Sequence, residues 1–310
     1  MEQQVRRLVT RSDFDGLACA MMLKELQLID EIKFVHPKDV QDGKIELSKN
    51  DITTNLPYDP RVSLAFDHHE SEVDRLKAIE TGGKLIIDPK ARSAARVVYD
   101  YYGGKEAFPR ISEDLMAAVD KGDSADFTMD EILDPKGWVL LHYLMDARTG
   151  LGRFHPFRIS NYDLMMELID YCLDHDIDEI LELPDVKERV ELYFEQAEQF
   201  KAQLRRIARV HDKVVVLDLR KEEVIHAGNR FMIYALYPET EISVHVAWGF
   251  RKQNTAVMIG KSIVNKASQV DIGELCLQYG GGGHRNAGTC QMDNDVVDEK
   301  LPDIIRALNG

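Results

Sequence analysis

Cysteine is scarce in this chain, which has four among 310 residues. They stand far apart, at Cys19, Cys172, Cys276 and Cys290, and no pair has C-x-x-C spacing. A disulfide framework and a thiolate zinc site of the usual kind are therefore excluded. Widely separated cysteines of this sort are typical of reduced thiols in a cytoplasmic protein.

Long apolar runs are also missing. No stretch approaches the roughly 18–20 consecutive apolar residues that span a bilayer. The first seven residues contain no apolar run and pass directly into a strand-like Leu8–Thr10, so we expect no secretory signal. The sequence predicts a cytoplasmic protein without a membrane partner.

Positive charge is in deficit, since 39 Lys and Arg face 54 Asp and Glu and the net charge is −15. A protein that coats long nucleic acid usually presents a basic surface, which argues against long duplex nucleic acid as a partner. A short anionic substrate remains compatible, because a local basic pocket or a bound cation can reverse the field. The composition, with 44% apolar and 30% charged residues, is that of an ordinary globular protein long enough for about two domains.

The N-terminal part of the chain alternates short apolar runs with amphipathic stretches, a pattern that predicts an α/β fold with a mostly parallel sheet. The expected strands are Leu8–Thr10, Ile32–Val35, Asp51–Thr54, Val62–Phe66 and Leu85–Ile87. The expected helices are Leu17–Leu28, Ser93–Tyr102 and Ile111–Val119. Ligands of such sheets bind outside the carboxyl ends of the strands, so polar residues directly after a strand matter most.

A long helix is predicted over Val186–Val210, where apolar residues recur at helical spacing without Gly or Pro. We expect it to connect a first domain, residues 1–185, with a smaller mixed α/β domain, residues 211–310. The strands expected in the second domain are Val214–Leu217, Phe231–Leu236, Ile242–Trp248, Thr255–Ile259 and Ala287–Gln291, and the helices are Ile272–Tyr279 and Val296–Leu308.

The first candidate site is Ser12-Asp13-Phe14-Asp15-Gly16, between the first strand and the first helix. Two carboxylates at positions i and i+2 can aim at one point, and hard divalent cations prefer such oxygen ligands. Gly16 permits the turn, and the helix N-terminus that follows adds partial positive charge. Taken alone, the motif favours the simpler interpretation of a turn with a helix-capping Asp.

The second candidate site is Asp67-His68-His69, directly after the apolar run of residues 62–66. One imidazole can bind a metal and the other can meet substrate, while Asp67 can orient its neighbour. The alternative is a surface turn that happens to carry histidines. The residue types alone leave the two interpretations level.

The third candidate site is the run Gly280, Gly281, Gly282 and Gly283, followed by His284 and Arg285. Glycines bring backbone N–H groups close to an anion, and the two side chains add further donors. A flexible linker is the weaker alternative, because an apolar helix precedes the run and a strand-like segment follows it. Lys261 and Ser262 could add a phosphate contact, although a solvated lysine at a strand end is the simpler interpretation.

In this order and spacing, the three motifs resemble the DHH phosphoesterase superfamily with its DHH-associated C-terminal domain. That superfamily includes RecJ exonuclease, nanoRNases, cyclic-dinucleotide phosphodiesterases and, more distantly, manganese pyrophosphatases and exopolyphosphatases. The resemblance extends from Leu8 to Gly288. It implies a parallel α/β domain, a helical linker and a smaller substrate-binding domain.

The resemblance also implies roles for single residues. Asp13 and Asp15 match the two metal carboxylates of the first motif. In Asp67-His68-His69, the first histidine is usually a metal ligand and the second faces the substrate.

The family's last metal-binding Asp matches Asp123, in Asp-Ser-Ala-Asp-Phe, and Asp120 is the alternative. Residues 281–285 match the phosphate loop of the C-terminal domain, and Lys261-Ser262 falls where that domain often has Arg-Ser.

Two positions depart from the family pattern. Arg11 stands where many members place a histidine, and Asn55 is the best match to a second-motif Asp that often bridges two metals. A neutral amide binds a hard cation less strongly than a carboxylate does. We therefore predict a weakened first-metal site, with Arg11 partly replacing a cation as a phosphate ligand. The ion then retained would be bound by Asp15, His68 and Asp123.

These features predict a metal-dependent phosphoesterase in which Arg285 neutralises phosphoryl charge and His69 acts as an acid. Mn²⁺ is the expected cofactor, with Mg²⁺ or Co²⁺ as alternatives and one or two ions bound. The expected substrate is a short oligonucleotide or a dinucleotide. Polyphosphate cleaved by an exopolyphosphatase-like enzyme is a second option, and a nucleotide-binding protein with a weakened site is a third. The oligomeric state is open, a homodimer included.

Overall fold

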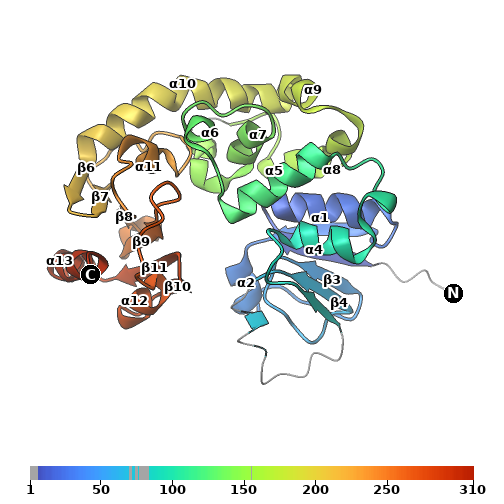
Figure 1. Ribbon diagram of the computed structural model, residues 1–310, viewed down its shortest axis with the longest axis horizontal. Coiled ribbons are helices and arrows are strands. Elements are labelled where there is room, and N and C mark those ends of the chain that lie inside the picture. Colours follow the sequence, from blue (N-terminus) through green and yellow to red (C-terminus); the bar gives the residue numbers. More distant parts are fainter. Residues whose placement is uncertain (1–5, 70–71, 74–75, 77–83, 155) are drawn as a thin grey trace. The chain divides into compact units, whose positions relative to one another are not determined.

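The computed structural model describes residues 6–69, 72–73, 76, 84–154 and 156–310. They form two compact units (Figure 1). The first unit takes in Met1–Asp126, Lys136–Ala147 and Phe154–Glu191, and the second Phe127–Pro135, Arg148–Arg153 and Leu192–Gly310.

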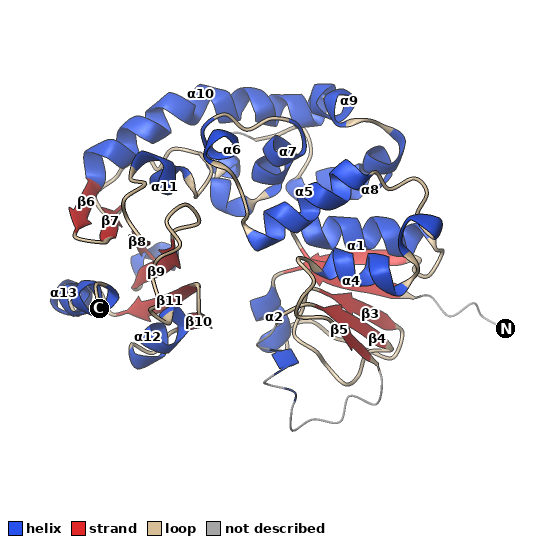
Figure 2. Cartoon of the chain, viewed as in Figure 1, coloured by secondary structure: helices blue, strands red, loops and turns tan. Residues whose placement is uncertain are grey.

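The first unit is built on a five-stranded parallel sheet (Figure 2). In the order β2-β1-β3-β4-β5, its strands are Glu31–Val35, Arg7–Arg11, Asp51–Thr54, Leu64–Asp67 and Leu85–Ile87. Thr10 of β1 pairs with Phe34 of β2 on one side and with Thr54 of β3 on the other. Because all strands run the same way, their carboxyl ends meet at one edge of the sheet, where ligands of such folds bind.

Helix α1 (Phe14–Glu25) lies with α4 (Ala94–Tyr101) over one face of this sheet (Figure 1). It also contacts α5 (Glu113–Ser124) and α8 (Asn161–Asp174), and Phe14 through Leu23 are all buried. A helix enclosed on all sides has no polar stripe, which explains why its sequence is apolar all round. The opposite face of the sheet, where Val9 and Ala65 point, is covered by α2 (Pro37–Gln41) and by an apolar cluster that includes Leu56 and Val62.

The helices that complete the first unit are α7 (Gly137–Met145), α9 (Ile177–Glu182) and the start of α10 (Pro184–Ile207), which continues into the second unit. Single 3₁₀ turns occur at Gly104–Glu106, Ala147–Thr149, Leu151–Arg153 and Phe250–Lys252.

The second unit contains a six-stranded mixed sheet in the order β10-β11-β9-β8-β7-β6. In that order, the strands are Gly282–His284, Ala287–Met292, Thr255–Lys261, Ile242–Trp248, Val214–Asp218 and Ala208–His211. The helices of this unit are α6 (Met129–Leu133), α11 (Met232–Leu236), α12 (Ile272–Gln278) and α13 (Val297–Leu308). Its apolar core joins alternate residues of the sheet, such as Val244 and Val257, to Ile272 of α12 and Ile304 of α13.

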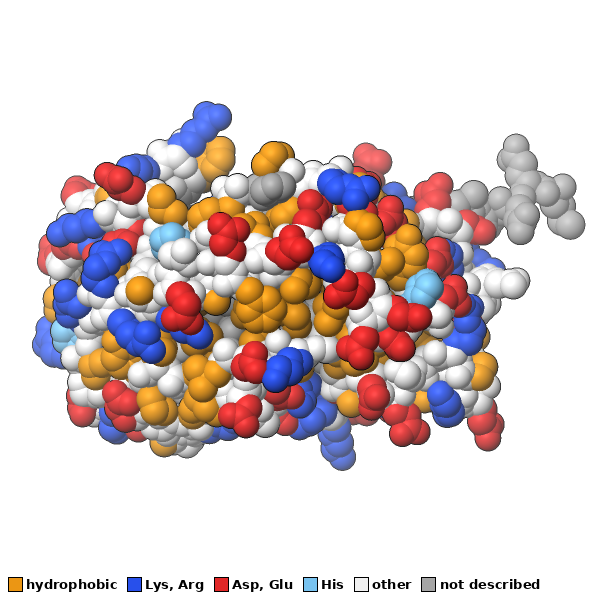
Figure 3. Space-filling model, turned by 90° about the horizontal axis from the view of Figure 1, so that it is seen from above, with side chains coloured by type: hydrophobic (Ala, Val, Ile, Leu, Met, Phe, Trp, Pro, Cys, Tyr) orange, Lys and Arg blue, Asp and Glu red, His pale blue; other side chains and the backbone are white. Residues whose placement is uncertain are grey.

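The predicted fold class is confirmed: an α/β unit with a parallel sheet, a second mixed-sheet unit and a long helix between them. The domain boundaries drawn at residues 185 and 211 stay a prediction. Within the described residues, no helix is long and apolar enough to cross a membrane. On the face drawn in Figure 3, acidic side chains are interspersed with basic ones rather than sorted into separate fields.

One predicted element is wrong in type and one in extent. The helix expected to reach Val210 ends at Ile207, and the residues after it belong to β6. Phe231–Leu236, expected as a strand, contains the short helix α11, Met232–Leu236. Asn229 starts it, because its side-chain oxygen accepts from the N–H of Phe231 at 3.1 Å and its carbonyl from that of Met232 at 3.2 Å. Topology favours a helix here, since β7 and β8 are parallel neighbours and such strands need a crossover between them.

Candidate functional site

The loop after β1 places Asp13 at the N-cap of α1. One carboxylate oxygen accepts from the N–H of Gly16 at 3.0 Å, and the other lies 2.8 Å from Nε of Arg11. A Cβ on Gly16 would lie 2.0 Å from the carbonyl oxygen of Arg11, so this turn requires glycine. The simpler interpretation, a helix-capping Asp, is therefore realised. The second oxygen of Asp13 faces the guanidinium of Arg11, and the role of Asp13 as a metal ligand stays a prediction.

Asp15 is buried and accepts two backbone hydrogen bonds, from the N–H groups of Ala94 at 3.1 Å and Ala95 at 2.7 Å. These amides begin α4, and a helix N-terminus favours a negative charge. Burial nevertheless raises the pKa of Asp15 well above its usual range, and the carboxylates of Asp123 and Asp13 raise it further. A bound cation would relieve this repulsion. The motif did not reveal the two amides; the only sequence signal was Ser93 at the expected start of the helix.

His68 follows β4 and turns Nε2 toward Asp123. Its Nδ1 lies 3.3 Å from the carbonyl oxygen of Ala91, which can only accept, so Nδ1 carries the proton. Nε2 then lies 2.8 Å from Oδ2 of Asp123. A ring held by a backbone carbonyl in this way is typical of a metal-ligating histidine.

His68 and Asp123 each change the pKa of the other. Burial disfavours a charged ring at His68, but Asp123, followed by Asp15 and Asp67, raises its pKa to about 9. Burial works against ionisation of Asp123, yet His68 and the charge of Arg11 lower its pKa. Each group of the pair thus favours the charged form of the other.

Asp15, His68 and Asp123 come from three different elements, and their ligand atoms lie within 4.8 Å of one another. Two carboxylates and one imidazole form a mixed oxygen and nitrogen donor set, which suits divalent cations of the Mn²⁺ and Mg²⁺ kind. These residues fit a bound divalent cation.

Asp67 and His69 form a second pair beside this cluster. Nδ1 of His69 lies 2.7 Å from Oδ1 of Asp67, which also accepts from the backbone N–H of His68 at 2.8 Å. Asp67 is buried, whereas the side chain of His69 is 39% exposed. Asp67, His68 and His69 also satisfy the spacing for a metal. Asp67 is already engaged by both histidines, which gives it an orienting role.

The structure separates Asp120 from Asp123. Asp120 accepts from the hydroxyl of Ser93 at 2.7 Å and from two nitrogens of Arg96 at 2.6 and 3.0 Å. It therefore ties α5 to α4. Asp123, the preferred match to the family motif, lies 2.8 Å from Nε2 of His68, and its role as a metal ligand stays a prediction.

Asn55 lies at the carboxyl end of β3, with its backbone N–H donating to the carbonyl of Phe66 at 3.1 Å. Its φ of 53° is in the left-handed region, its side chain is buried, and neither amide atom has a hydrogen-bond partner among the described residues. An unpaired buried amide is costly, and such strain is concentrated at functional sites. The structure thus places Asn55 at the predicted edge without showing it as a ligand.

In the second unit, the glycine run forms the end of α12 and a β-hairpin. The N–H groups of Gly280 and Gly281 donate to the carbonyls of Leu277 at 3.1 Å and Cys276 at 2.9 Å. Strand β10 then pairs with β11, with Gly282 opposite Thr289. The expectation of a loop is corrected here, because part of the run is strand and the N–H of Gly281 closes the helix.

Two basic residues lie at the hairpin, Arg285 and Lys261, whose backbone N–H donates to the carbonyl of Asn286 at 2.9 Å. Arg285 lies at the two-residue tip of the hairpin, between the paired His284 and Ala287, and is exposed like His284. Burial, followed by repulsion from Arg285, lowers the pKa of Lys261. Ser262 is buried, and its hydroxyl accepts from the N–H groups of Val264 and Asn265 at 3.2 and 3.0 Å, so it stabilises its own turn.

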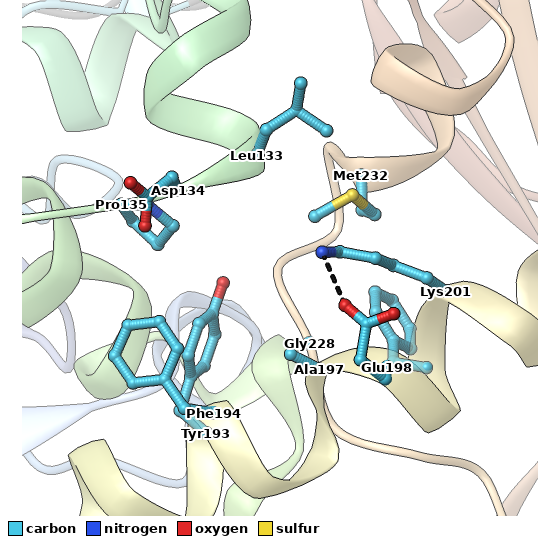
Figure 4. Close-up of a pocket in the computed structure, with 11 residues that line it drawn as sticks. Leu133, Asp134, Pro135, Tyr193, Phe194, Ala197, Glu198, Lys201, Gly228 and Met232 are labelled. Atoms are coloured by element: carbon cyan, nitrogen blue, oxygen red, sulfur yellow. Dashed lines mark hydrogen bonds and ion pairs between the residues drawn. The ribbon is translucent and has the colours of Figure 1, made fainter.

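A pocket of about 200 Å³ also lies in the second unit (Figure 4). Tyr193 and Phe194 of α10, Leu133 and Met232 line it, and an ion pair joins Glu198 to Lys201 at 3.0 Å. None of the predicted site residues lines it, and we assign it no role.

Comparison with known proteins supplies the remaining evidence. No family model and no curated protein matches the chain. Among solved structures, a pGpG-specific phosphodiesterase, PggH from Vibrio cholerae, is 55% identical, with 98% of this chain and 99% of that one covered and a TM-score of 0.84. The chain belongs to the DHH phosphoesterase superfamily.

Two RecJ exonucleases share the family fold at 15% identity. One, from Thermus thermophilus with Mn²⁺, matches 99% of this chain and 52% of its own at a TM-score of 0.53. The other, bound to manganese, matches 99% and 91% at 0.52. The predicted family and enzyme class are thereby confirmed: the chain is a DHH-type phosphodiesterase, a metal-dependent hydrolase.

Proposed function

We propose that this enzyme hydrolyses the phosphodiester bond of the linear dinucleotide pGpG. The observation that carries the proposal is the 55% identity, over 98% of the chain, to a pGpG-specific phosphodiesterase. An acidic protein with a few local cations suits such a short anion better than a long duplex. The four cysteines are free and buried, which supports a cytoplasmic location.

Asp15, His68 and Asp123 are the residues we assign to one divalent ion, with Mn²⁺ as first choice. A cation held there supplies a water of lowered pKa near neutral pH. Arg11 provides the second positive charge, because its Nε holds Asp13 while the other guanidinium nitrogens can donate to a phosphoryl oxygen. Asn55 replaces a charge with an amide at the same edge, which also favours a single ion.

His69 acts as the general acid, and Asp67 orients its ring. The buried carboxylate accepts from Nδ1 of His69 at 2.7 Å, which leaves Nε2 on the exposed side of the ring. A proton carried at Nε2 can be delivered to the leaving oxygen. The hairpin residues Gly282, Gly283, His284 and Arg285, with Lys261, are assigned to a phosphate or sugar of the substrate away from the scissile bond.

The deciding experiment is hydrolysis by purified, metal-stripped protein with and without Mn²⁺. The panel is pGpG, pApA, cyclic di-GMP, a 3′,5′-bisphosphate nucleotide and polyphosphate. We expect Mn²⁺-dependent conversion of pGpG to GMP, at a higher kcat/KM than for any other compound. A preference for polyphosphate would replace the proposal with an exopolyphosphatase-like reaction, and binding without cleavage would contradict an active enzyme.

The number of ions is tested at Asn55. Calorimetric titration of the wild type with Mn²⁺ should give one ion per chain, and Asn55→Asp should tighten binding or add a second ion. An unchanged stoichiometry and affinity in the variant would show that Asn55 is not at the metal edge.

A further inference from the structure

His142 of α7 packs against the residues that precede two members of the cluster formed by Asp15, His68 and Asp123. His142 is buried, and its ring lies against α5 at Gly122, the residue before Asp123. A Cβ built on Gly122 would lie 2.5 Å from Nδ1 and 2.7 Å from Cε1 of His142. The α5 backbone thus rests on the imidazole at a distance that only glycine permits.

The same ring also contacts the other metal-binding segment. Its centroid lies 6.2 Å from that of Phe14, which stands between Asp13 and Asp15, with the planes tilted by 58°. Phe14 is buried and stacks in turn on Trp138, one turn earlier on α7, at 6.1 Å and 26°. Trp138, Phe14 and His142 therefore form one packed row.

The carboxylates on these two segments repel each other. Their ligand oxygens lie within 4.8 Å of each other, and like charges that close repel strongly away from bulk water. Something must hold the two segments at the spacing a cation requires, and close-packed interiors transmit even small displacements of a neighbour. A site loose by 1 Å loses much of its affinity. His142 touches the residue immediately before each carboxylate, which makes it the natural spacer.

We propose that His142 is a positioning residue that acts through Gly122 and Phe14 to set the separation of the Asp15 and Asp123 carboxylates. It thereby controls the affinity and geometry of the bound cation without touching it. The inference rests on the proposed role of these carboxylates as metal ligands.

The first test uses His142→Ala and His142→Phe. Partners outside the ligand shell typically change metal affinity about 10- to 100-fold. We expect the Kd of Mn²⁺ to rise at least about tenfold in His142→Ala, with a changed electron paramagnetic resonance spectrum of the bound ion. His142→Phe keeps a flat ring in place and should stay within about threefold of wild type. An alanine variant with wild-type Kd and spectrum would overturn the proposal.

The second test is a double-mutant cycle. Gly122→Ala should weaken Mn²⁺ binding, because its methyl group meets the ring. Removing the ring makes room for that methyl, so Gly122→Ala with His142→Ala should lose less affinity than the two single changes added together. Additive losses would show that the two positions do not act on the metal through each other.

The matched control is Val62→Ala, a cavity-forming change in the same unit on the opposite face of the sheet. It should lower the thermal stability of the metal-free protein and leave the Kd of Mn²⁺ unchanged. If the control weakens Mn²⁺ as much as His142→Ala, affinity merely follows stability and the positioning role fails. Failure of the wild type to bind Mn²⁺ would instead contradict the proposed metal site.

Discussion

The candidate sites of the two units are built from different kinds of residue. In the first unit, charged side chains from several elements converge at the carboxyl edge of a parallel sheet. In the second, the chain from Gly280 to Gly283 has no side chains, and a Cβ on Gly281 would lie 2.2 Å from the carbonyl oxygen of Thr289. Replacing a charged residue of the first unit by alanine therefore removes a functional group. Replacing a glycine of the second unit by alanine adds a methyl group that can collide with its neighbours.

Removing a ligand of the first unit should have the largest effect. His68→Ala should lower Mn²⁺-dependent hydrolysis about a thousandfold or more, because the several kcal/mol that a bound cation contributes are lost. The measurements are kcat/KM and Mn²⁺ binding. His175→Ala, at an exposed histidine after α8, is the control and should keep full activity. Wild-type activity in His68→Ala would show that the residue is no ligand.

Adding a methyl group in the second unit should have the next largest effect. A methyl group on Gly281 would collide with Thr289 and Cys290 of β11, so Gly281→Ala should displace the start of β10 and raise KM about 10- to 100-fold with Mn²⁺ binding unchanged. Gly152→Ala is the control in the same unit, because a methyl group added there would meet no atom within 4 Å. Equal effects of the two changes would mean that backbone fit does not matter here.

Removing the cation at the hairpin tip should have a smaller effect. Arg285→Ala should raise KM about tenfold, or about 1.4 kcal/mol of binding, and leave kcat near wild type. Arg306→Ala, at an exposed arginine on α13, should leave KM unchanged. A loss confined to kcat would contradict the role given to the hairpin.

The smallest expected effect is on the pH dependence of stability. One histidine in each unit should change the free energy of unfolding in opposite directions with pH. His68 has a pKa raised to about 9, whereas burial, aided by the charge of Arg230, lowers the pKa of His245 to about 4. An unfolded histidine titrates near 6.5. The stability that His68 contributes to the metal-free protein is thus complete below pH 6.5 and lost as the pH rises through 9. The stability that His245 contributes as a neutral ring is complete above pH 6.5 and is lost as the pH falls toward 4.

The upper limit is about 3 kcal/mol for each histidine, and solvent screening reduces it. Urea unfolding of metal-free protein between pH 4 and 10 measures both effects. His68→Gln should flatten the alkaline side of the stability curve, and His245→Gln the acid side. If each variant keeps the wild-type curve, these groups do not titrate differently on folding.

Much of the fold could be predicted where buried segments show a clear pattern of apolar residues in the sequence. Leu85–Ile87 and Ile242–Trp248 were predicted to the residue, because strands of a covered sheet leave short runs rich in apolar residues. Asp51–Thr54 was also predicted to the residue, although Ile52 is its one apolar residue. Phe231–Leu236 was not, since a run of six apolar residues fits a short helix as well as a strand. The position of β7 and β8 in the sheet decided it, and no local pattern encodes that pairing.

The site was predictable only as far as its motifs extend. Asp120 and Asp123 lie three residues apart on one helix, so spacing could not separate them. Ser93 and Arg96, well before them in the chain, engage Asp120 and leave Asp123 to the cluster. His142 stands in an apolar helix without any motif, and its contact with Gly122 exists only in three dimensions.

The order of strands in the first sheet has a further consequence. Strand β1 lies between β2 and β3, so the chain leaves β1 over one face, through α1, and leaves β3 over the other, through the apolar segment around Leu56 and Val62. Two neighbouring strands whose connections depart in opposite directions create a crevice at their carboxyl ends, whatever residues follow them. Arg11 ends β1 and Asn55 directly follows β3, so the two residues flank this point. The order of the strands thus fixes where the site lies and the residues at the strand ends fix its chemistry, so Arg11 could be exchanged for a histidine without a change of fold.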